Sequence, residues 1–171
     1  MGRLTENLES IAERIRQRFT EKDKAREKAL GLSRDTIRYS SAAIRALHRQ
    51  ESDEARETLR KARRSLDELD KALVEAPDLQ FAGFIHDAEK EYAEGCVTLA
   101  LVTREPLPDP ESLGVNYPAY LHGTGEAGGE LRRYLLDGIR RDDLSRSEEL
   151  MAAMDDIYSV LVTMDFPDAI T

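Results

Sequence analysis

Apolar residues recur every three or four positions along most of this chain, which is the spacing of an amphipathic α-helix. In the first part of the chain they are Leu4, Leu8, Ile11, Ile15, Phe19, Leu30, Ile37, Ile44 and Leu47. No proline interrupts this part, although Gly31 weakens it, because glycine costs about 1 kcal/mol relative to alanine inside a helix. The pattern predicts one long helix, or two nearly continuous ones, over about residues 5–50. A helix of this length usually needs partners along it, which indicates an oligomer.

Two further helices are predicted before the middle of the chain. Ser52 and Asp53 suit the capping position of a helix over about residues 54–75, which Pro77 ends. A helix over about residues 79–103 follows, and its apolar stripe keeps the helical spacing throughout. The stripe consists of Phe81, Ile85, Ala88, Tyr92, Cys96, Leu99 and Val102.

Residues 105–116 are rich in proline and are predicted to form a loop between helices. Asn116 can cap the next helix, which is predicted over about residues 117–141 with Pro118 in its first turn. The segment Ser145-Arg-Ser-Glu148 has the pattern of a capping box and starts a fifth helix that ends near Met164. We find no internal repeat and no segment that resembles a β-strand. The sequence therefore predicts a single all-α domain over residues 1–171.

The composition agrees with a helical protein that has solvated outer faces, since 40% of the residues are hydrophobic and 35% are charged. A net charge of −9 argues against nucleic-acid binding by the whole surface and leaves room for a local basic patch. Cys96 is the single cysteine, which excludes an internal disulfide, and the chain has no Cys/His metal spacing. No apolar run reaches the length of a membrane span, and no signal sequence is recognisable. We therefore expect a cytoplasmic protein.

Acidic residues gather on the predicted third helix, where Asp87, Glu91 and Glu94 share one face. Like charges at this spacing repel by a few tenths of a kcal/mol per pair, so the helix itself gains nothing from them. Glu91 and Glu94 flank the apolar stripe and lie at the boundary between core and solvent. A second pair, Glu126 and Glu130, follows in the Gly-rich fourth helix. Either these faces are solvated and paired with basic side chains, or a cation binds between the two helices.

A basic segment is the second candidate site, because phosphate contacts require clustered cations. Its members are Arg45, His48, Arg49, Arg56, Arg60, Lys61, Arg63 and Arg64. The alternative is that these side chains pair with Glu54, Glu57, Asp67 and Glu68 on a solvated helical surface. Tyr39 is the one aromatic residue nearby, so base stacking is weakly indicated. The other two histidines, His86 and His122, form no ligand spacing along the chain and are expected to lie on the surface.

Two segments of the sequence, taken together, resemble the translin family. They are Glu91-Tyr-Ala-Glu94 and, after the Pro-rich loop, Tyr120-Leu-His-Gly-Thr-Gly-Glu126-Ala-Gly-Gly-Glu130-Leu-Arg-Arg133. Further similarity lies in Leu32–Asp35, Arg45–Arg49, Tyr158–Leu161 and Phe166–Ile170. The resemblance covers the chain from about Ala25 onward, and it is strongest to the branch of translin-associated factor X and its archaeal relatives.

The resemblance implies a bundle of long helices that assembles into closed, barrel-like octamers around single-stranded RNA or DNA. In the factor X branch it also implies a metal-dependent endoribonuclease that uses Mg²⁺ or Mn²⁺. The carboxylates of that site fall on Glu91, Glu94, Glu126 and Glu130, and the family more often has Asp at the position of Glu126. The alternative is translin itself, which lacks this acidic set and binds single-stranded nucleic acid without the same catalytic constellation. Family members usually continue into a further helix of about 30 residues, which we expect this chain to lack.

Overall fold

The structure is a computed structural model that describes residues 5–167, all of whose regular elements are helical. Their bounds are α1 Leu8–His48, α2 Ser52–Glu75, the 3₁₀ turn η1 Pro77–Leu79, α3 Gly83–Thr103, α4 Pro110–Leu113, α5 Tyr117–Arg140 and α6 Ser147–Leu161. The all-α prediction and the long first helix are confirmed. No helix in the described range has both the length and the apolarity needed to cross a bilayer.

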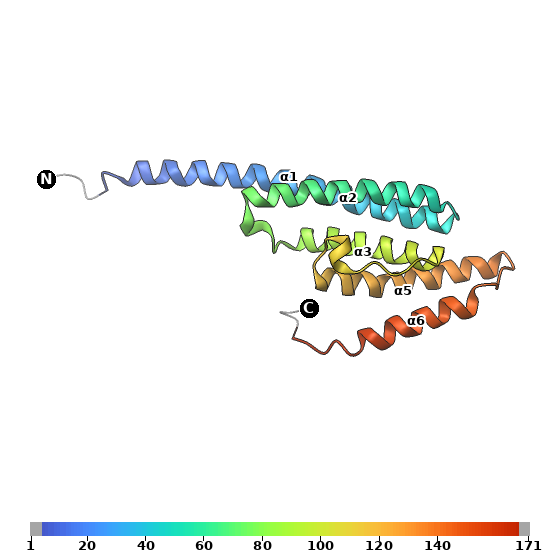
Figure 1. Cartoon of the computed structure of the whole chain (residues 1–171). Coiled ribbons are helices and arrows are strands. Elements are labelled where there is room, and N and C mark those ends of the chain that lie inside the picture. The colour runs from blue at the N-terminus through green and yellow to red at the C-terminus, as the bar shows by residue number, and fades with distance from the viewer. Residues whose placement is uncertain (1–4, 168–171) are drawn as a thin grey trace.

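The helices form a layered bundle in which α1 and α2 make a hairpin, α3 packs against both, and α5 and α6 follow (Figure 1). The N-terminal part of α1 extends beyond the end of α2 (Figure 1). Its apolar residues Leu8, Ile15 and Phe19 are exposed, with Phe19 at 68%. The C-terminal part of α1 is thus packed against the bundle, whereas the apolar stripe of its N-terminal part is uncovered. This agrees with the prediction that the long helix needs partners.

The connection between α3 and α5 determines how the two helices lie. It runs back along α3 to the end where α3 begins, so that α3 and α5 run parallel (Figure 1). Most of this connection is a loop without regular structure, as predicted, and it also contains the single turn α4. Tyr120 holds it by donating a hydrogen bond to the carbonyl of Pro108. Parallel packing keeps a constant sequence offset between facing residues, which decides the composition of the site described below.

The core is made largely of leucines and alanines from the inner faces of the helices. Leu47, Leu66, Leu69 and Leu131 are at most 2% exposed, and nine alanines in the described helices have no exposed surface. Small alanine side chains let the helix axes approach closely, which excludes water along the contacts. The predicted stripe of α3 is correct except for Phe81, which is 92% exposed. Phe81 lies before the start of α3 at Gly83, in the turn after η1, and so it does not follow the helix period.

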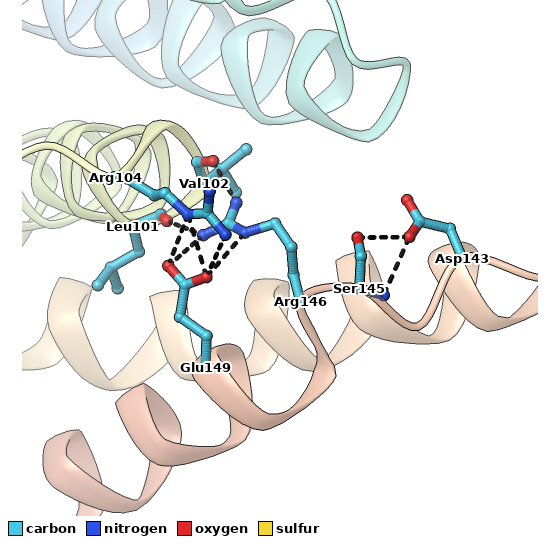
Figure 2. Close-up of polar contacts among 7 residues, drawn as sticks. All are labelled: Leu101, Val102, Arg104, Asp143, Ser145, Arg146 and Glu149. Carbon is cyan, nitrogen blue, oxygen red and sulfur yellow. Dashed lines mark hydrogen bonds and ion pairs between the residues drawn. The ribbon is translucent and has the colours of Figure 1, made fainter.

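The predicted helix caps are correct at one of three places. Asn116 accepts a hydrogen bond from the N–H of Ala119 and caps α5. Ser52 is instead the first residue of α2, whose capping position holds Glu51 without a side-chain cap bond. Ser145 was expected to cap α6, but its hydroxyl donates to Asp143 in the preceding turn, and α6 begins two residues later (Figure 2).

Arg146 attaches the start of α6 to the end of α3. Its guanidinium donates to the carbonyls of Leu101 and Val102 and to the carboxylate of Glu149, which also accepts from Arg104 (Figure 2). These hydrogen bonds to Arg104 and Arg146 lower the pKa of Glu149 to about 2. The carbonyls at the C-terminal end of a helix lack partners within it, so the arginine satisfies groups that would otherwise depend on water.

Candidate metal centre between α3 and α5

Two contacts hold α3 and α5 in register. Glu89 of α3 accepts hydrogen bonds from the backbone N–H and the side-chain amide of Asn116, at the start of α5. About two turns further along α5, Gly123 lies directly against α3. A Cβ atom built on Gly123 would lie 2.5 Å from the carbonyl oxygen of Lys90 and 2.8 Å from the nitrogen of Glu94. Only glycine permits this approach, because both neighbouring atoms belong to the backbone of α3.

Facing residues on the two parallel helices are offset by 36 positions. The offset pairs His86 with His122 and Lys90 with Glu126. It would pair Glu94 with Glu130 next. One turn of helix separates successive pairs, since residues i and i+4 lie on the same face. The acidic residues of α3 and α5 therefore meet along one seam of the bundle.

Three of the four predicted carboxylates come together on this seam. Each of Glu91, Glu94 and Glu126 offers an oxygen, and these oxygens lie within 4.8 Å of one another. Glu94 is buried at 7% exposure, Glu91 is half-buried, and Glu126 is open to solvent. The group thus has a buried floor and one exposed side, which is the shape expected of a site that an ion or a substrate enters from outside.

Lys90 spans the two halves of the cluster. Its Nζ lies 2.8 Å from an oxygen of Glu126 and 3.6 Å from an oxygen of Glu91. This contact confirms part of the alternative reading, in which basic side chains pair with the acidic face. One ammonium group offsets about one of three negative charges, so a surplus of negative charge remains in the cluster.

Burial, together with the charges of Glu91, Glu126 and Glu130, raises the pKa of Glu94 to about 8. Burial also raises the pKa of Glu91, where the charge of Lys90 acts in the opposite direction. A divalent cation at this position would reverse the effect, because opposite charge favours the ionised carboxylate.

The raised pKa predicts a dependence of stability on pH. Between about pH 4.5 and 8, the unfolded chain has released the proton of Glu94 whereas the folded chain retains it, so the free energy of unfolding falls as the pH rises. Above about pH 8 both states are ionised and this contribution becomes constant. Glu94→Gln removes the titrating group.

Chemical denaturation in the presence of a chelator, at steps between pH 4.5 and 9, measures this effect. We expect the stability of Glu94→Gln relative to the unmodified chain to increase with pH up to about 8. A difference that is independent of pH would contradict the assignment of the raised pKa to Glu94.

Glu130, the fourth predicted carboxylate, lies outside the group of three. One of its oxygens is 2.5 Å from Nε2 of His48 at the end of α1. His48 is 8% exposed in its side chain, and its Nδ1 lies 3.7 Å from Asp137. The structure therefore places His48 in a contact between α1 and α5, and its side chain is not presented to solvent as a nucleic-acid contact would require.

Most of the predicted basic residues are paired with acids. Arg49 pairs with Glu51 and Glu54, Arg56 with Glu105, Arg60 and Arg64 with Glu57, and Arg63 with Asp67 and Asp70. Arg63 also donates to the carbonyl of Leu113 and so holds α4 against α2. Arg45 and Lys61 are exposed, and neither side chain has an ion pair within residues 5–167. The paired arginines agree with the alternative that these side chains form ion pairs on a solvated helical surface. Arg45 and Lys61 remain available to contact phosphate.

His86 and His122 were not expected to meet, yet Nε2 of His86 lies 3.1 Å from Nδ1 of His122. The two residues are 36 positions apart and belong to different helices. A search for ligand spacing along one segment misses such a pair. The parallel offset that joins Lys90 to Glu126 is the signal that finds it.

The donor set of Glu91, Glu94 and Glu126 fits a hard divalent cation. Mg²⁺ and Mn²⁺ prefer oxygen ligands, and Mg²⁺ typically takes one or two carboxylates and keeps several waters. Two oxygens that bind one ion at about 2.0–2.1 Å lie at most about 4.2 Å apart, so oxygens within 4.8 Å of one another need only a small side-chain movement to share an ion. Burial, together with the neighbouring carboxylates, raises the pKa of Glu94, and a bound cation would favour its ionised form. The three residues can therefore hold a metal ion.

Comparison with known structures supports the fold. The structure of an AfC3PO–duplex RNA complex has a TM-score of 0.85 and 31% identity, covering 93% of this chain and 82% of that chain. The crystal structure of AfC3PO gives a TM-score of 0.84 and 31% identity, over 93% and 83% of the two chains. The crystal structure of apo-NeC3PO, at 17% identity, has a TM-score of 0.83 over 98% and 87%, which supports the fold alone.

Comparison with curated sequences finds an uncharacterized protein of Methanocaldococcus jannaschii that is 27% identical over 147 residues. These residues are 85% of this chain and 65% of that protein, so the chain spans somewhat less than two thirds of its relative. No family model matches the chain. The identity to AfC3PO over most of both chains, together with the shared arrangement of helices, shows that this chain belongs to the translin family.

Proposed function

We propose that this protein is a metal-dependent endoribonuclease with its active site at Glu91, Glu94 and Glu126. The observation that carries the proposal is the meeting of these three carboxylates on the seam between α3 and α5. Their residue types and positions agree with the resemblance to the factor X branch of the family. Glu130 belongs to the proposal as a neighbour whose charge acts on Glu94.

The roles of the side chains follow from their burial. Glu94 and Glu91 form the inner wall and hold the ion, while Glu126 faces solvent at the side from which a phosphate group approaches. Mg²⁺ or Mn²⁺, when bound, supplies charge stabilisation for an attacking and a leaving oxygen of a phosphodiester. Lys90 contacts the exposed Glu126, and a lysine side chain has several rotatable bonds, so its ammonium group can exchange a carboxylate partner for a phosphate oxygen.

The proposed substrate is RNA. The AfC3PO structure at 31% identity is a complex with duplex RNA, whereas the family resemblance points to single-stranded RNA or DNA. Both kinds of RNA therefore belong in the test. Of the predicted basic residues, Arg45 and Lys61 remain available for phosphate. The paired arginines contribute where a phosphate displaces a surface carboxylate.

Removing Arg45 or Lys61 is expected to weaken RNA binding uniformly across sequences. Each phosphate contact contributes about one unit to the slope of log affinity against log salt concentration. We expect Arg45→Gln and Lys61→Gln each to reduce that slope by about 1 while the melting temperature stays unchanged, because neither side chain is paired within the described structure. Fluorescence anisotropy with labelled RNA at several salt concentrations measures the slope.

Arg63→Gln provides the control, because this side chain is held by Asp67, Asp70 and the carbonyl of Leu113. We expect Arg63→Gln to lower the melting temperature clearly and to have a smaller effect on the slope of log affinity against log salt concentration. An unchanged salt slope in both Arg45→Gln and Lys61→Gln would remove these residues from the proposed interface.

Assembly into a homo-oligomer is part of the proposal. The exposed apolar side chains of α1 and those of Met151, Tyr158 and Phe166 in and after α6 support it, since monomers rarely expose so many. An octamer follows from the family resemblance alone, and a cytoplasmic location is proposed from the sequence features given above. Sedimentation velocity of the intact chain measures the copy number.

A second candidate function is nucleic-acid binding without catalysis. The observation that favours it is the contact of Lys90 with Glu126 and Glu91, which partly neutralises the cluster without any metal. Under this alternative, RNA is retained in the presence of a chelator and is not cleaved with any divalent ion.

The decisive assay incubates the purified chain with 5′-labelled single-stranded and duplex RNA, in Mg²⁺, in Mn²⁺ and in chelator. We expect cleavage of RNA in either metal and none in chelator, with binding in all three conditions. Binding without cleavage in every condition would support the non-catalytic alternative, and cleavage that persists in chelator would indicate a contaminating nuclease.

A further inference from the structure

His86 and His122 lie at the open end of the seam between α3 and α5, one helical turn before Lys90 and Glu126. Nε2 of His86 and Nδ1 of His122 are 3.1 Å apart, and the ring centroids are 5.2 Å apart in an edge-to-face arrangement. His122 is exposed and His86 is half-buried. The pair plays no part in the proposed function.

The separation of the two nitrogens suits a shared metal ion. Two nitrogen ligands at about 2.0–2.1 Å from a tetrahedral zinc ion lie about 3.4 Å apart. The observed 3.1 Å is close to this value, and the imidazole of His122 is exposed, so it can rotate to direct its lone pair at an ion. A hydrogen bond between the rings uses a single proton, and an ion in its place would use the same two nitrogens.

The backbone under the pair is already fixed. Gly123, the residue after His122, is in direct contact with the backbone of α3, and Glu89 holds the start of α5. Ligands carried by two locked helices lose little freedom on binding, which favours affinity. Exposure of His122 leaves the remaining coordination positions to water or to an anion.

The charges around the pair permit a cation. Asp87 follows His86 directly in the sequence, and the ammonium group of Lys90 is already compensated by Glu126 and Glu91. Burial and the charge of His122 lower the pKa of His86, which favours the neutral imidazole.

We propose that His86 and His122 form a second metal site, which takes a transition-metal ion of the zinc class and joins α3 to α5. Imidazole nitrogen favours Zn²⁺, Ni²⁺ or Cu²⁺ over Mg²⁺, so the two sites of the seam differ in ligand chemistry. The inference does not depend on catalysis at the carboxylates.

Zinc titration of the intact chain by calorimetry tests the proposal, with excess Mg²⁺ present to occupy the carboxylates. We expect one zinc ion to bind, and His86→Asn and His122→Asn each to weaken zinc binding by about tenfold or more. Glu94→Gln is the matched control, which is expected to keep zinc binding. Circular dichroism of each variant confirms that the helices are intact.

Copper provides an independent measurement, because electron paramagnetic resonance of Cu²⁺ detects couplings to imidazole nitrogen. We expect couplings from two nitrogens in the unmodified chain and from no more than one in His122→Asn. Equal zinc affinity in His122→Asn and the unmodified chain would overturn the proposal, as would a loss of zinc binding in Glu94→Gln alone. The zinc-binding results do not depend on the ribonuclease assay. Failure of the proposed zinc site is therefore distinguishable from failure of the proposed ribonuclease activity.

Discussion

Replacement of Gly123 by alanine is expected to destabilise the protein and to open the candidate site. The new Cβ would lie 2.5 Å from the carbonyl oxygen of Lys90 and 3.0 Å from the Cβ of Ala93. Atoms of the α3 backbone cannot move aside without shifting the helix, and such overpacking costs about 1–3 kcal/mol. The shift would also separate Glu126 from Glu91 and Glu94, so RNA cleavage is expected to fall with stability.

Gly128→Ala is the matched control, in the same helix and with no atom within 4 Å of the new Cβ. Alanine is favoured over glycine inside a helix by about 1 kcal/mol, so this variant is expected to be slightly more stable. Urea denaturation followed by circular dichroism compares the two. Equal stability of Gly123→Ala and Gly128→Ala would contradict the close approach of α3 and α5.

Glu94→Gln is expected to abolish RNA cleavage while leaving the fold and RNA binding intact. Glutamine has nearly the same size but no charge, so it removes the buried ligand without creating a cavity. A metal that stabilises the transition state contributes several kcal/mol, and its loss corresponds to about a hundredfold or more in rate. The variant is also expected to be no less stable above pH 4.5, because it removes an ionisable group that burial disfavours.

Asp87→Asn is the control for this variant, since Asp87 is exposed on the same helix and lies outside the three-carboxylate group. Single-turnover cleavage of labelled RNA, together with anisotropy for binding, separates the chemical step from affinity. Cleavage by Glu94→Gln at the rate of Asp87→Asn would remove Glu94 from the site.

The helices were predictable because the signal for each one lies within its own segment of the sequence. The period of apolar residues identifies all five long helices, and Asn116 gives the start of α5. Errors occurred where local sequence competes with tertiary contacts. Ser145 has the pattern of a cap but bonds to Asp143, because Arg146 fixes the chain to the end of α3 instead. Phe81 fits a helix period but lies in the turn that precedes α3.

The meeting of carboxylates from the two helices was predictable, whereas the position of Glu130 outside the group of three was not. Spacing and the family resemblance indicated Glu91, Glu94, Glu126 and Glu130, but only packing shows that Glu130 lies against His48. The contacts of Glu89, Lys90 and Gly123 depend on the parallel register of α3 and α5. That register is determined by the course of the connection between them, which no local pattern encodes.

Binding of Mn²⁺ to the purified chain, measured by electron paramagnetic resonance of the free ion, tests the central claim that the three carboxylates form a metal site. The account predicts that the unmodified chain binds Mn²⁺ with an affinity that rises with pH up to about 8, as Glu94 ionises. It also predicts at least about tenfold weaker binding in Glu94→Gln, with a smaller dependence on pH. Equal Mn²⁺ affinity in the two proteins, at every pH, would contradict it.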